Sequence, residues 1–193
     1  MNKDIEKSIK TLNQGGIVIF PTDTAYGIGC RIDKTNSVRK LFKTRKRPES
    51  QPALVLVDSI EMAQNYLMPF DLKVRKLIEK YWPGALTIVY NCQIEKVPSP
   101  VRGGGKTLGV RMPDHPLILR LIKEVGVPIL GPSANFHGER TPYRLEEINP
   151  KLLKLVDCVV KGNTNKILKP STVVDCTEKP WKILRDGEIK LRI

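Results

Sequence analysis

The sequence has few residues that bind zinc or form disulfides. Its 193 residues include 4 cysteines and 2 histidines, and no two cysteines form a Cys-x-x-Cys pair. Because zinc sites need clustered thiolates and imidazoles, this pattern argues against a zinc site. The thiols are predicted to be reduced and unpaired, as in a cytosolic protein; they belong to Cys30, Cys92, Cys158 and Cys176.

Long apolar segments are absent as well. The first residues, Met1 to Glu6, lack the apolar core of a signal peptide. No stretch of the sequence is both long and apolar enough to span a bilayer. We therefore expect a soluble, cytoplasmic protein with no membrane partner.

Two common phosphate-binding motifs are also missing. Gly105-Lys106-Thr107 resembles the end of a Walker A loop, but Pro100 stands where its first glycine belongs. The residues after Thr107 predict a strand, whereas a P-loop needs a helix N-terminus there. Gly27-Ile28-Gly29 begins like a dinucleotide fingerprint, but Ile32 replaces the third glycine. A nucleotide would therefore bind by another geometry.

Positive charge, in contrast, is abundant. Lys and Arg number 33 against 20 Asp and Glu, which gives a formal net charge of +13. This balance favours anionic partners, namely nucleotides, nucleic acid or an acidic surface, without distinguishing among them. The hydrophobic fraction of 40% argues against wholesale disorder. Without an internal repeat, a low-complexity tract or a linker, one domain over residues 1–193 is expected.

Apolar runs and periodicity predict an α/β protein. Helices are expected at residues 5–12, 38–42, 60–67, 72–81, 116–125 and 152–155. Strands are expected at residues 17–20, 53–57, 86–90, 108–112, 127–130, 156–160, 172–174 and 181–184. The irregular alternation predicts a mixed, twisted sheet. Residues 91–106 look irregular, and the glycines at 103–105 make this segment our candidate for a mobile loop that closes over a site.

Polar clusters follow or interrupt the apolar runs. Arg45-Lys46-Arg47-Pro48 is a concentrated positive charge, and Ser133-Ala134-Asn135 offers a hydroxyl and an amide after an apolar run. The segment from Thr22 to Gly29 follows a predicted strand and is rich in hydroxyls, as are segments that line ligand crevices. Each cluster taken alone also fits a solvated charge run or an ordinary turn. Together they favour a site that holds a polyphosphate and a small polar substrate.

Further motifs connect these clusters to a known family. Trp82-Pro83-Gly84, Thr107 to Pro113, and Ser171-Thr172-Val173 with Arg185-Asp186-Gly187 are collinear with the clusters above. From about residue 15 to 187, this order and spacing resemble the YrdC family. The resemblance implies a single YrdC-like α/β domain, with a twisted, open, mixed sheet flanked by helices and a positively charged concave cavity.

The resemblance also implies an activity. Family members of this type are threonylcarbamoyl-AMP synthases, which form L-threonylcarbamoyladenylate and pyrophosphate from L-threonine, bicarbonate and ATP. The product feeds the threonylcarbamoyl modification of the tRNA adenosine beside the anticodon, through a downstream transferase machinery. Magnesium is expected on the phosphates of ATP, and no protein metal ligand is implied.

Site residues carry over from the family by position. Contacts with L-threonine are implied for Thr24, Arg111 and Ser171. Contacts with ATP are implied for Arg47, Thr107, Ser133, Asn135, Thr141 and Arg185. Catalytic roles are implied for Arg45, Arg47, Ser133 and Asn135. Arg45 stands where the family usually has lysine, and Leu56 where some members have a histidine.

Alternatives remain open at this point. Arg111 could pair with Asp114 or another carboxylate, Arg185 could pair with Asp186, and Trp82 fits core packing better than base stacking. The high charge would also suit a diverged paralogue that binds tRNA or double-stranded RNA. A carbamoyl-handling enzyme with another acceptor would have the same fold.

Overall fold

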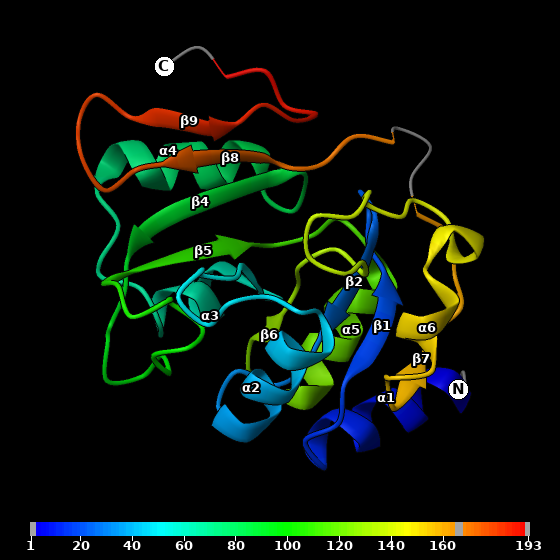
Figure 1. The fold of residues 1–193 in the computed structure, drawn as a ribbon. Helices are drawn as coiled ribbons and strands as arrows, with labels where there is room; N and C mark the ends of the chain where they lie inside the picture. The colour runs from blue at the N-terminus through cyan, green and yellow to red at the C-terminus, as the bar shows by residue number, and fades with distance from the viewer. Residues whose placement is uncertain (1–2, 165–167, 192–193) are drawn as a thin grey trace.

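The structure, a computed structural model, describes residues 3–164 and 168–191. Two open β-sheets with helices packed against them make up this part of the chain (Figure 1). The smaller sheet has the strand order β2-β1-β7. Its strands are β1 (Val18–Pro21), β2 (Tyr26–Gly29) and β7 (Cys158–Val159), with β2 antiparallel and β7 parallel to β1.

The larger sheet has the strand order β6-β3-β5-β4-β8-β9. Strands β3 and β5 are parallel, as are β4 and β8, and the other pairs are antiparallel. The sheet is therefore mixed, as expected. Its strands are β3 (Val55–Leu56), β4 (Leu86–Asn91), β5 (Thr107–Arg111), β6 (Ile129–Leu130), β8 (Thr172–Asp175) and β9 (Lys182–Arg185).

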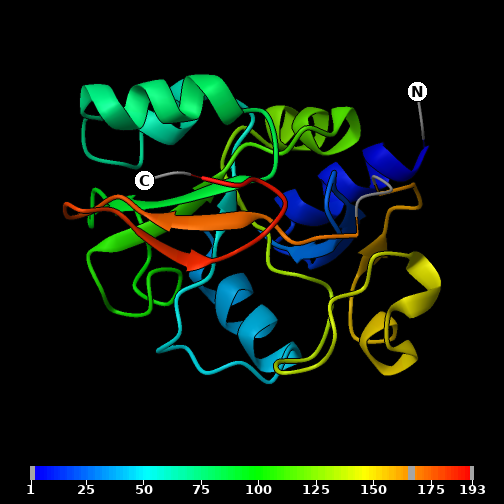
Figure 2. The same ribbon diagram turned by 90° about the horizontal axis from the view of Figure 1, so that it is seen from above.

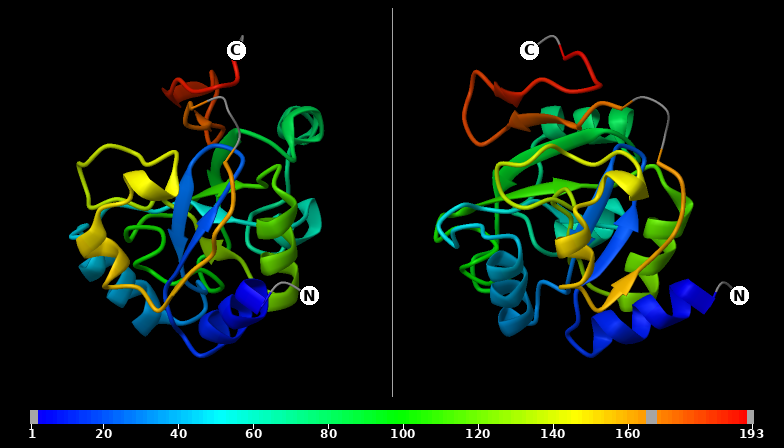
Figure 3. Two further views of the ribbon diagram at one scale, coloured as in Figure 1. Left: turned by 90° about the vertical axis from the view of Figure 1, so that its right-hand side faces the viewer. Right: turned by 45° about the vertical axis from the view of Figure 1, so that its right-hand side comes forward.

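Helices cover the two sheets unequally. Helices α1 (Lys3–Asn13) and α5 (Pro116–Val125) pack on the smaller sheet through a shared apolar cluster. Helix α4 (Leu72–Tyr81) lies along one face of the larger sheet, while the opposite face looks toward α2 (Thr35–Thr44) and neighbouring loops (Figure 2). The start of α1 and strand β9 lie at opposite ends of the molecule (Figure 3). The shorter helical elements are α3 (Ile60–Gln64), the 3₁₀ helix Leu145–Glu147 and α6 (Pro150–Leu153).

Local sequence explains where these helices begin and end. In α5, the apolar residues Ile118, Leu121, Ile122 and Val125 recur at helical spacing, and all four are buried. Pro116 occupies the first turn, and Gly126 ends the helix with a left-handed φ of 76°. Helix α4 begins after Asp71, whose carboxylate accepts a hydrogen bond from the backbone N–H of Val74 at 2.8 Å.

The two sheets meet where β2 approaches β6. The backbones of Gly27 and Ser133 form an isolated bridge, and the backbone N–H of Ala134 donates to the carbonyl of Tyr26 at 2.8 Å. A Cβ atom at Gly29 would lie 2.0 Å from the carbonyl oxygen of Leu130, so only glycine permits this approach. This junction places residues 133–135 beside the start of β2, close to the end of β1.

The structure refines several expectations. Residues Tyr26–Gly29 form strand β2, which pairs with β1 as a hairpin; no strand was expected there. Thr107 begins strand β5, which confirms that no Walker A helix follows it. Asn91 is the last residue of β4, and residues 92–106 are irregular, but the buried side chains of Val97 and Val101 anchor this segment to the core. Trp82 is buried in that core, and its indole N–H donates to the carbonyl of Leu86.

The four cysteines are buried and unpaired. Within residues 3–164 and 168–191, no helix has the length and apolar character needed to cross a membrane.

Candidate functional site

Two adjoining cavities open on the face of the larger sheet opposite α4. The larger has a volume of about 280 Å³ and lies between β4, β5, β8 and the residues that follow α2. The smaller has a volume of about 60 Å³ and lies between the β1–β2 turn and the start of β8. Both are lined by Leu54, Ser133 and Arg185, so they form one continuous site. The predicted residues that line one or both are Thr24, Arg45, Arg47, Thr107, Arg111, Ser133, Thr141, Ser171 and Arg185.

Arg45 is the most unusual cation of the larger cavity. It caps the C-terminus of α2, and its side chain is 3% exposed. Its Nε donates to the backbone carbonyl of Asn135 at 3.0 Å and its Nη2 to the Oδ1 of Asn135 at 3.4 Å. Its Nη1 is buried without a partner in the described residues. Burial, and secondly the charge of Arg47, lower the pKa of Arg45 to about 10.

Asn135 lies behind Arg45 and lines neither cavity. Its amide nitrogen donates to the carbonyls of Phe136 and Glu139, at 2.9 and 2.7 Å. These bonds fix the amide so that its oxygen faces Arg45. Asn135 therefore positions Arg45 in the structure, and the contact with the nucleotide that the family resemblance implies stays a prediction.

Arg47 also lines the larger cavity without an acidic partner in the described chain. Its Nη2 donates to the carbonyl of Pro52 at 2.7 Å, and its Nη1 lies 3.5 Å from the Nδ1 of His137. Burial lowers the pKa of Arg47. Lys46, between the two arginines, has a left-handed φ of 55°, and its ammonium lies over the ring of Phe136. This turn places both arginines on the cavity wall and Lys46 outside it.

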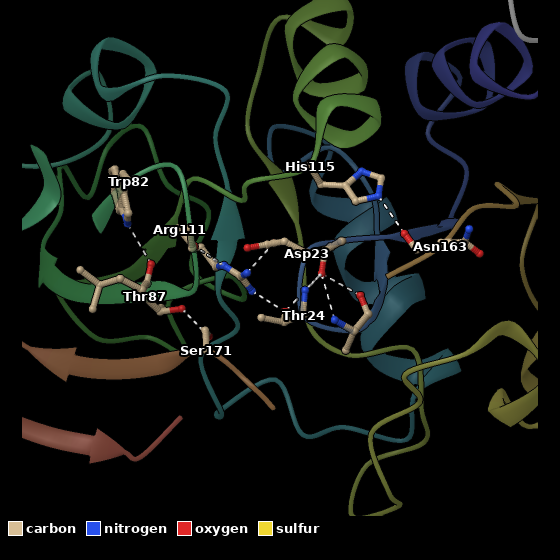
Figure 4. Close-up of polar contacts among 12 residues, drawn as sticks. Asp23, Thr24, Trp82, Thr87, Arg111, His115, Asn163 and Ser171 are labelled. Carbon is tan, nitrogen blue, oxygen red and sulfur yellow. Dashed lines mark hydrogen bonds and ion pairs between the residues drawn. The ribbon is translucent and has the colours of Figure 1, made fainter. Parts of the chain in front are cut away.

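Arg111 is the central cation of the smaller cavity (Figure 4). Its guanidinium donates to the carbonyl of Gly84 at 2.9 Å and to the hydroxyl of Thr24 at 2.7 Å. Its Nη2 forms a buried ion pair with the carboxylate of Asp23 at 2.5 Å. Burial lowers the pKa of Arg111, and the charge of Asp23 opposes that shift. The carboxylate partner left open by the sequence is therefore Asp23 and not Asp114.

The turn between β1 and β2 presents Thr24 to this cavity. The hydroxyl of Thr22 donates to the carbonyl of Ala25 at 2.7 Å and accepts the backbone N–H groups of Thr24 and Ala25, each at 3.2 Å. This local network fixes the turn, because the hydroxyl satisfies backbone groups that a hairpin of this length leaves unpaired. Thr24 then points toward Arg111, as Figure 4 shows.

Ser171 and Arg185 complete the opposite wall. Arg185 donates from Nε to the backbone carbonyl of Ser171 at 3.0 Å and from Nη2 to its hydroxyl at 2.9 Å. The hydroxyl of Ser171 also bonds the hydroxyl of Thr87 at 2.8 Å (Figure 4). Burial, and then the charge of Arg111, lower the pKa of Arg185. Arg185 is thus held by Ser171, and Asp186 pairs instead with Lys190.

Sequence reasoning missed two contributors to the site. Asp23 lies inside a motif that was singled out, but only its neighbour Thr24 was assigned a role. Thr87 is the second residue of β4 and is 1% exposed, and no local pattern marks it. The one signal in the sequence is its hydroxyl, a polar group beside the apolar residues Leu86 and Ile88.

The site has an excess of positive charge, which favours anionic ligands. Arg45, Arg47, Arg111 and Arg185 line the two cavities, and Asp23 is the one carboxylate that forms an ion pair with any of them in the described residues. Burial first, and the charge of a neighbouring arginine second, lower the pKa values of Arg45 and Arg185. A bound polyanion would offset these charges and supply hydrogen-bond acceptors to the unpartnered Nη1 of Arg45.

Comparison with known proteins places this site in context. Residues 10–187 match the Sua5/YciO/YrdC family model, described as "Telomere recombination". The chain is 35% identical over 185 residues to the threonylcarbamoyl-AMP synthase of Bacillus subtilis, covering 96% of this chain and 54% of that protein. It is 29% identical to the threonylcarbamoyl-AMP synthase of Vibrio campbellii, covering 96% of this chain and 100% of that protein.

Solved structures agree with these sequence matches. The structure of Pyrococcus abyssi Sua5 complexed with L-threonine superimposes with a TM-score of 0.91 at 33% identity, over 95% of this chain and 54% of that one. Escherichia coli YciO superimposes with a TM-score of 0.84 at 28% identity, over 95% of this chain and 88% of that one. The chain therefore spans about half the length of the Bacillus and Pyrococcus proteins and nearly the whole length of the others.

Proposed function

The chain belongs to the Sua5/YciO/YrdC family, and we propose that it synthesises threonylcarbamoyl-AMP. In this reaction L-threonine, bicarbonate and ATP give L-threonylcarbamoyladenylate, pyrophosphate and water. The observation that carries the proposal is the continuity of the two cavities. The larger is lined by arginines that form no ion pair in the described residues, and the smaller holds the guanidinium of Arg111, fixed by Asp23 and Thr24, beside that of Arg185. The names of the relatives support the same activity.

The larger cavity suits the nucleotide. The guanidiniums of Arg45 and Arg47 would bind the triphosphate, with the hydroxyl of Thr107 on the facing strand and Thr141 at the edge of the smaller cavity. The described lining offers guanidiniums and hydroxyls but no carboxylate. Mg²⁺ would enter on the phosphates of ATP and neutralise part of their charge.

The smaller cavity suits the amino acid. Arg111 uses one N–H of each Nη for Thr24 and Asp23, and the remaining N–H groups can bind the carboxylate of threonine. Ser171 adds a hydroxyl at the opposite wall. The side chains of Ala25, Leu54 and Leu56 form an apolar surface on which the methyl group of threonine can pack.

The chemistry requires alignment and charge stabilisation without a protein nucleophile. The amine of threonine attacks the carbon of bicarbonate, forming a C–N bond and releasing water and a carbamate. A carbamate oxygen then attacks the α-phosphorus of ATP, and pyrophosphate leaves. Arg45 and Arg47 would stabilise the charge that develops on the leaving pyrophosphate. The cavity walls hold the reactants together and keep water from the labile carbamate. The product would then pass to a transferase that acts on tRNA.

The direct test is pyrophosphate release. Purified protein with ATP, bicarbonate and magnesium should release pyrophosphate only when L-threonine is added, and the adenylate should be detectable by mass spectrometry. Omitting bicarbonate from degassed buffer is the matched control and should abolish release. A protein that binds ATP but releases no pyrophosphate with threonine would refute the proposed activity.

Loss of Arg47 should weaken nucleotide binding selectively. Arg47→Ala removes a charge-assisted contact to phosphate, so the affinity for ATP measured by calorimetry should fall by roughly 1.5–3 kcal/mol. Lys43→Ala removes an exposed charge from the same helix end without touching the cavity, and should leave ATP affinity nearly unchanged. Equal losses of ATP affinity in the two variants would show that Arg47 acts only through general electrostatic attraction and makes no direct contact with phosphate.

A further inference from the structure

Thr87 is a buried hydroxyl residue at the edge of the site. It is 1% exposed, and its Oγ1 lies 2.8 Å from the Oγ of Ser171, its one hydrogen-bond partner in the part of the chain that the structure describes. Thr87 lines the larger cavity and Ser171 the smaller. We propose that Thr87 is a positioning residue, which donates its proton to Ser171 and thereby directs the Ser171 proton toward L-threonine. This inference rests on the proposed function and adds to it a residue that acts through another side chain.

The fold fixes both branches of the Thr87 side chain. Its neighbours Leu86 and Ile88 point into the core, so Thr87 faces the opposite side of the sheet, where the larger cavity lies. Strand β4 lies between β5 and β8. On the β5 side, the Cγ2 of Thr87 lies 3.9 Å from the place where a Cβ at Gly109 would be. With the methyl group on that side, the hydroxyl faces Ser171, as Figure 4 shows.

A count of protons and lone pairs gives the direction of this hydrogen bond. A hydroxyl has one proton and two lone pairs, and the Oγ of Ser171 already accepts the Nη2–H of Arg185 at 2.9 Å. If Thr87 donates, the second lone pair of Ser171 is used and its proton stays available for a ligand. If Ser171 donated instead, the proton of Thr87 would need an acceptor on a cavity floor where the side chains of Val89 and Val173 offer none. The first arrangement leaves no unpaired donor on that floor and is therefore favoured.

The Ser171 proton serves the amino-acid cavity. Ser171 and Arg111 both line the smaller cavity, so a threonine whose carboxylate binds Arg111 can present an oxygen to Ser171. A donor whose direction is set before the ligand arrives needs no reorganisation on binding. Without the Thr87 proton the Ser171 hydroxyl is free to rotate, so part of the affinity for threonine is lost. The contacts proposed between ATP and Arg45 or Arg47 do not depend on this hydrogen bond.

Two substitutions at Thr87 separate the hydroxyl from the shape of the side chain. Thr87→Val keeps the shape but has no proton to donate, so the Kd for L-threonine measured by calorimetry should rise about tenfold, the equivalent of one hydrogen bond. The Kd for ATP should change by less than about threefold. Thr87→Ser retains a donor, and its Kd for L-threonine should stay within about threefold of the wild-type value. Loss of threonine binding in the serine variant equal to that in the valine variant would refute a role for the hydroxyl.

Thr172→Val is the matched control for the loss of a buried hydroxyl. Thr172 is fully buried and donates to the carbonyl of Ile189 at 2.6 Å, yet it lines neither cavity. This substitution should lower the midpoint of urea unfolding about as much as Thr87→Val does, while leaving the Kd for L-threonine unchanged. An equal rise in that Kd in both variants would show that Thr87 supports the fold and does not position Ser171.

A Ser171→Ala background tests whether Thr87 acts through Ser171. With no Ser171 hydroxyl to orient, adding Thr87→Val should raise the Kd for L-threonine by less than about twofold more, because the two changes remove the same contact. A further rise of about tenfold in that background would mean that Thr87 acts independently of Ser171, and would overturn the proposal.

NMR reads the direction of the hydrogen bond without turnover. A hydroxyl proton donated inside a protein exchanges slowly with water, and it is coupled to the Cβ of the residue that carries it. In protein made with isotope-labelled threonine and serine, a slowly exchanging proton should correlate with the Cβ of Thr87 and be absent from Thr87→Val. Such a proton on Ser171, or none on Thr87, would refute the proposal. A protein that binds L-threonine as described but releases no pyrophosphate would refute the proposed function and leave the role of Thr87 standing.

Discussion

Replacing Arg111 with alanine is expected to lower the free energy of unfolding by about 3–5 kcal/mol and to abolish threonine-dependent turnover. The structural cause of the first effect is Asp23, whose carboxylate is 4% exposed and depends on Arg111 as its cation. Without the guanidinium, a charged oxygen is left buried, and its lost hydration is not replaced. Urea unfolding followed by circular dichroism measures this loss directly.

A double variant separates the effect of Arg111 on threonine binding from its effect on stability. Combining Arg111→Met with Asp23→Asn removes both charges, so most of the lost stability should return. Threonine binding should not return, because no cation remains to hold its carboxylate. In that variant the threonine requirement should rise far more than the ATP requirement. Threonine affinity that recovers along with stability would show that Arg111 acts only as a structural partner of Asp23.

The buried pair also illustrates what sequence can and cannot predict. Thr24 and Arg111 were both expected at one site, on motifs separated by 87 residues, and they are hydrogen-bonded in the structure. The carboxylate of Asp23 was not expected there. Side chains alternate direction along an extended segment, but this residue lies in a turn whose geometry is set by the hydroxyl of Thr22. No periodicity therefore indicates where the Asp23 side chain points.

Strand β2 was missed for a related physical reason. All of its residues, Tyr26 to Gly29, are buried, so the alternation that marks a half-exposed strand is absent. Two of the four are glycines, which disfavour strands in isolation. Their function here is close packing, since Phe20 crowds Gly27 and the backbone of Leu130 crowds Gly29. Tertiary contacts, which no local window contains, decide this element.

Local sequence patterns predicted the helices that bury only one face. The helices expected at residues 116–125 and 72–81 have the bounds of α5 and α4 in the structure. The division into two sheets was beyond local reasoning, because it rests on parallel pairings between distant segments, such as Val18 with Cys158 and Leu86 with Thr172. Such pairings depend on the packing of the whole chain.

Arg45 is expected to show the opposite behaviour to Arg111. Its pKa of about 10, against an ordinary value of 12.5, corresponds to a cost on the order of 3 kcal/mol for keeping the buried charge at neutral pH. Hydrogen bonds to Asn135 offset part of that cost, at about 1 kcal/mol each. Arg45→Met removes both contributions, so the free energy of unfolding should change by less than about 1 kcal/mol. Thermal or urea unfolding of the two proteins provides this comparison.

Nucleotide binding should suffer strongly in the same variant. The Nη1 of Arg45 is buried at the cavity without a partner in the described residues, which is the arrangement expected of a donor that waits for a ligand oxygen. We expect Arg45→Met to weaken the binding of ATP and of pyrophosphate by about 3 kcal/mol, or on the order of a hundredfold in Kd. Arg45→Lys, which keeps the charge but not the fork, should recover only part of this loss.

If Arg45→Met is stable but binds nucleotide poorly, the buried charge of Arg45 serves ligand binding and not the stability of the fold. Asn135 gives an independent check, because Asn135→Ala removes the oxygen that orients the Nη2 of Arg45 while leaving the cavity wall intact. ATP affinity should fall in that variant, and adding Arg45→Met should then cause little further loss, since both changes act on the same contact. Full additivity of the two losses, or a loss of stability above about 3 kcal/mol with unchanged ATP affinity, would instead assign Arg45 to the support of the fold.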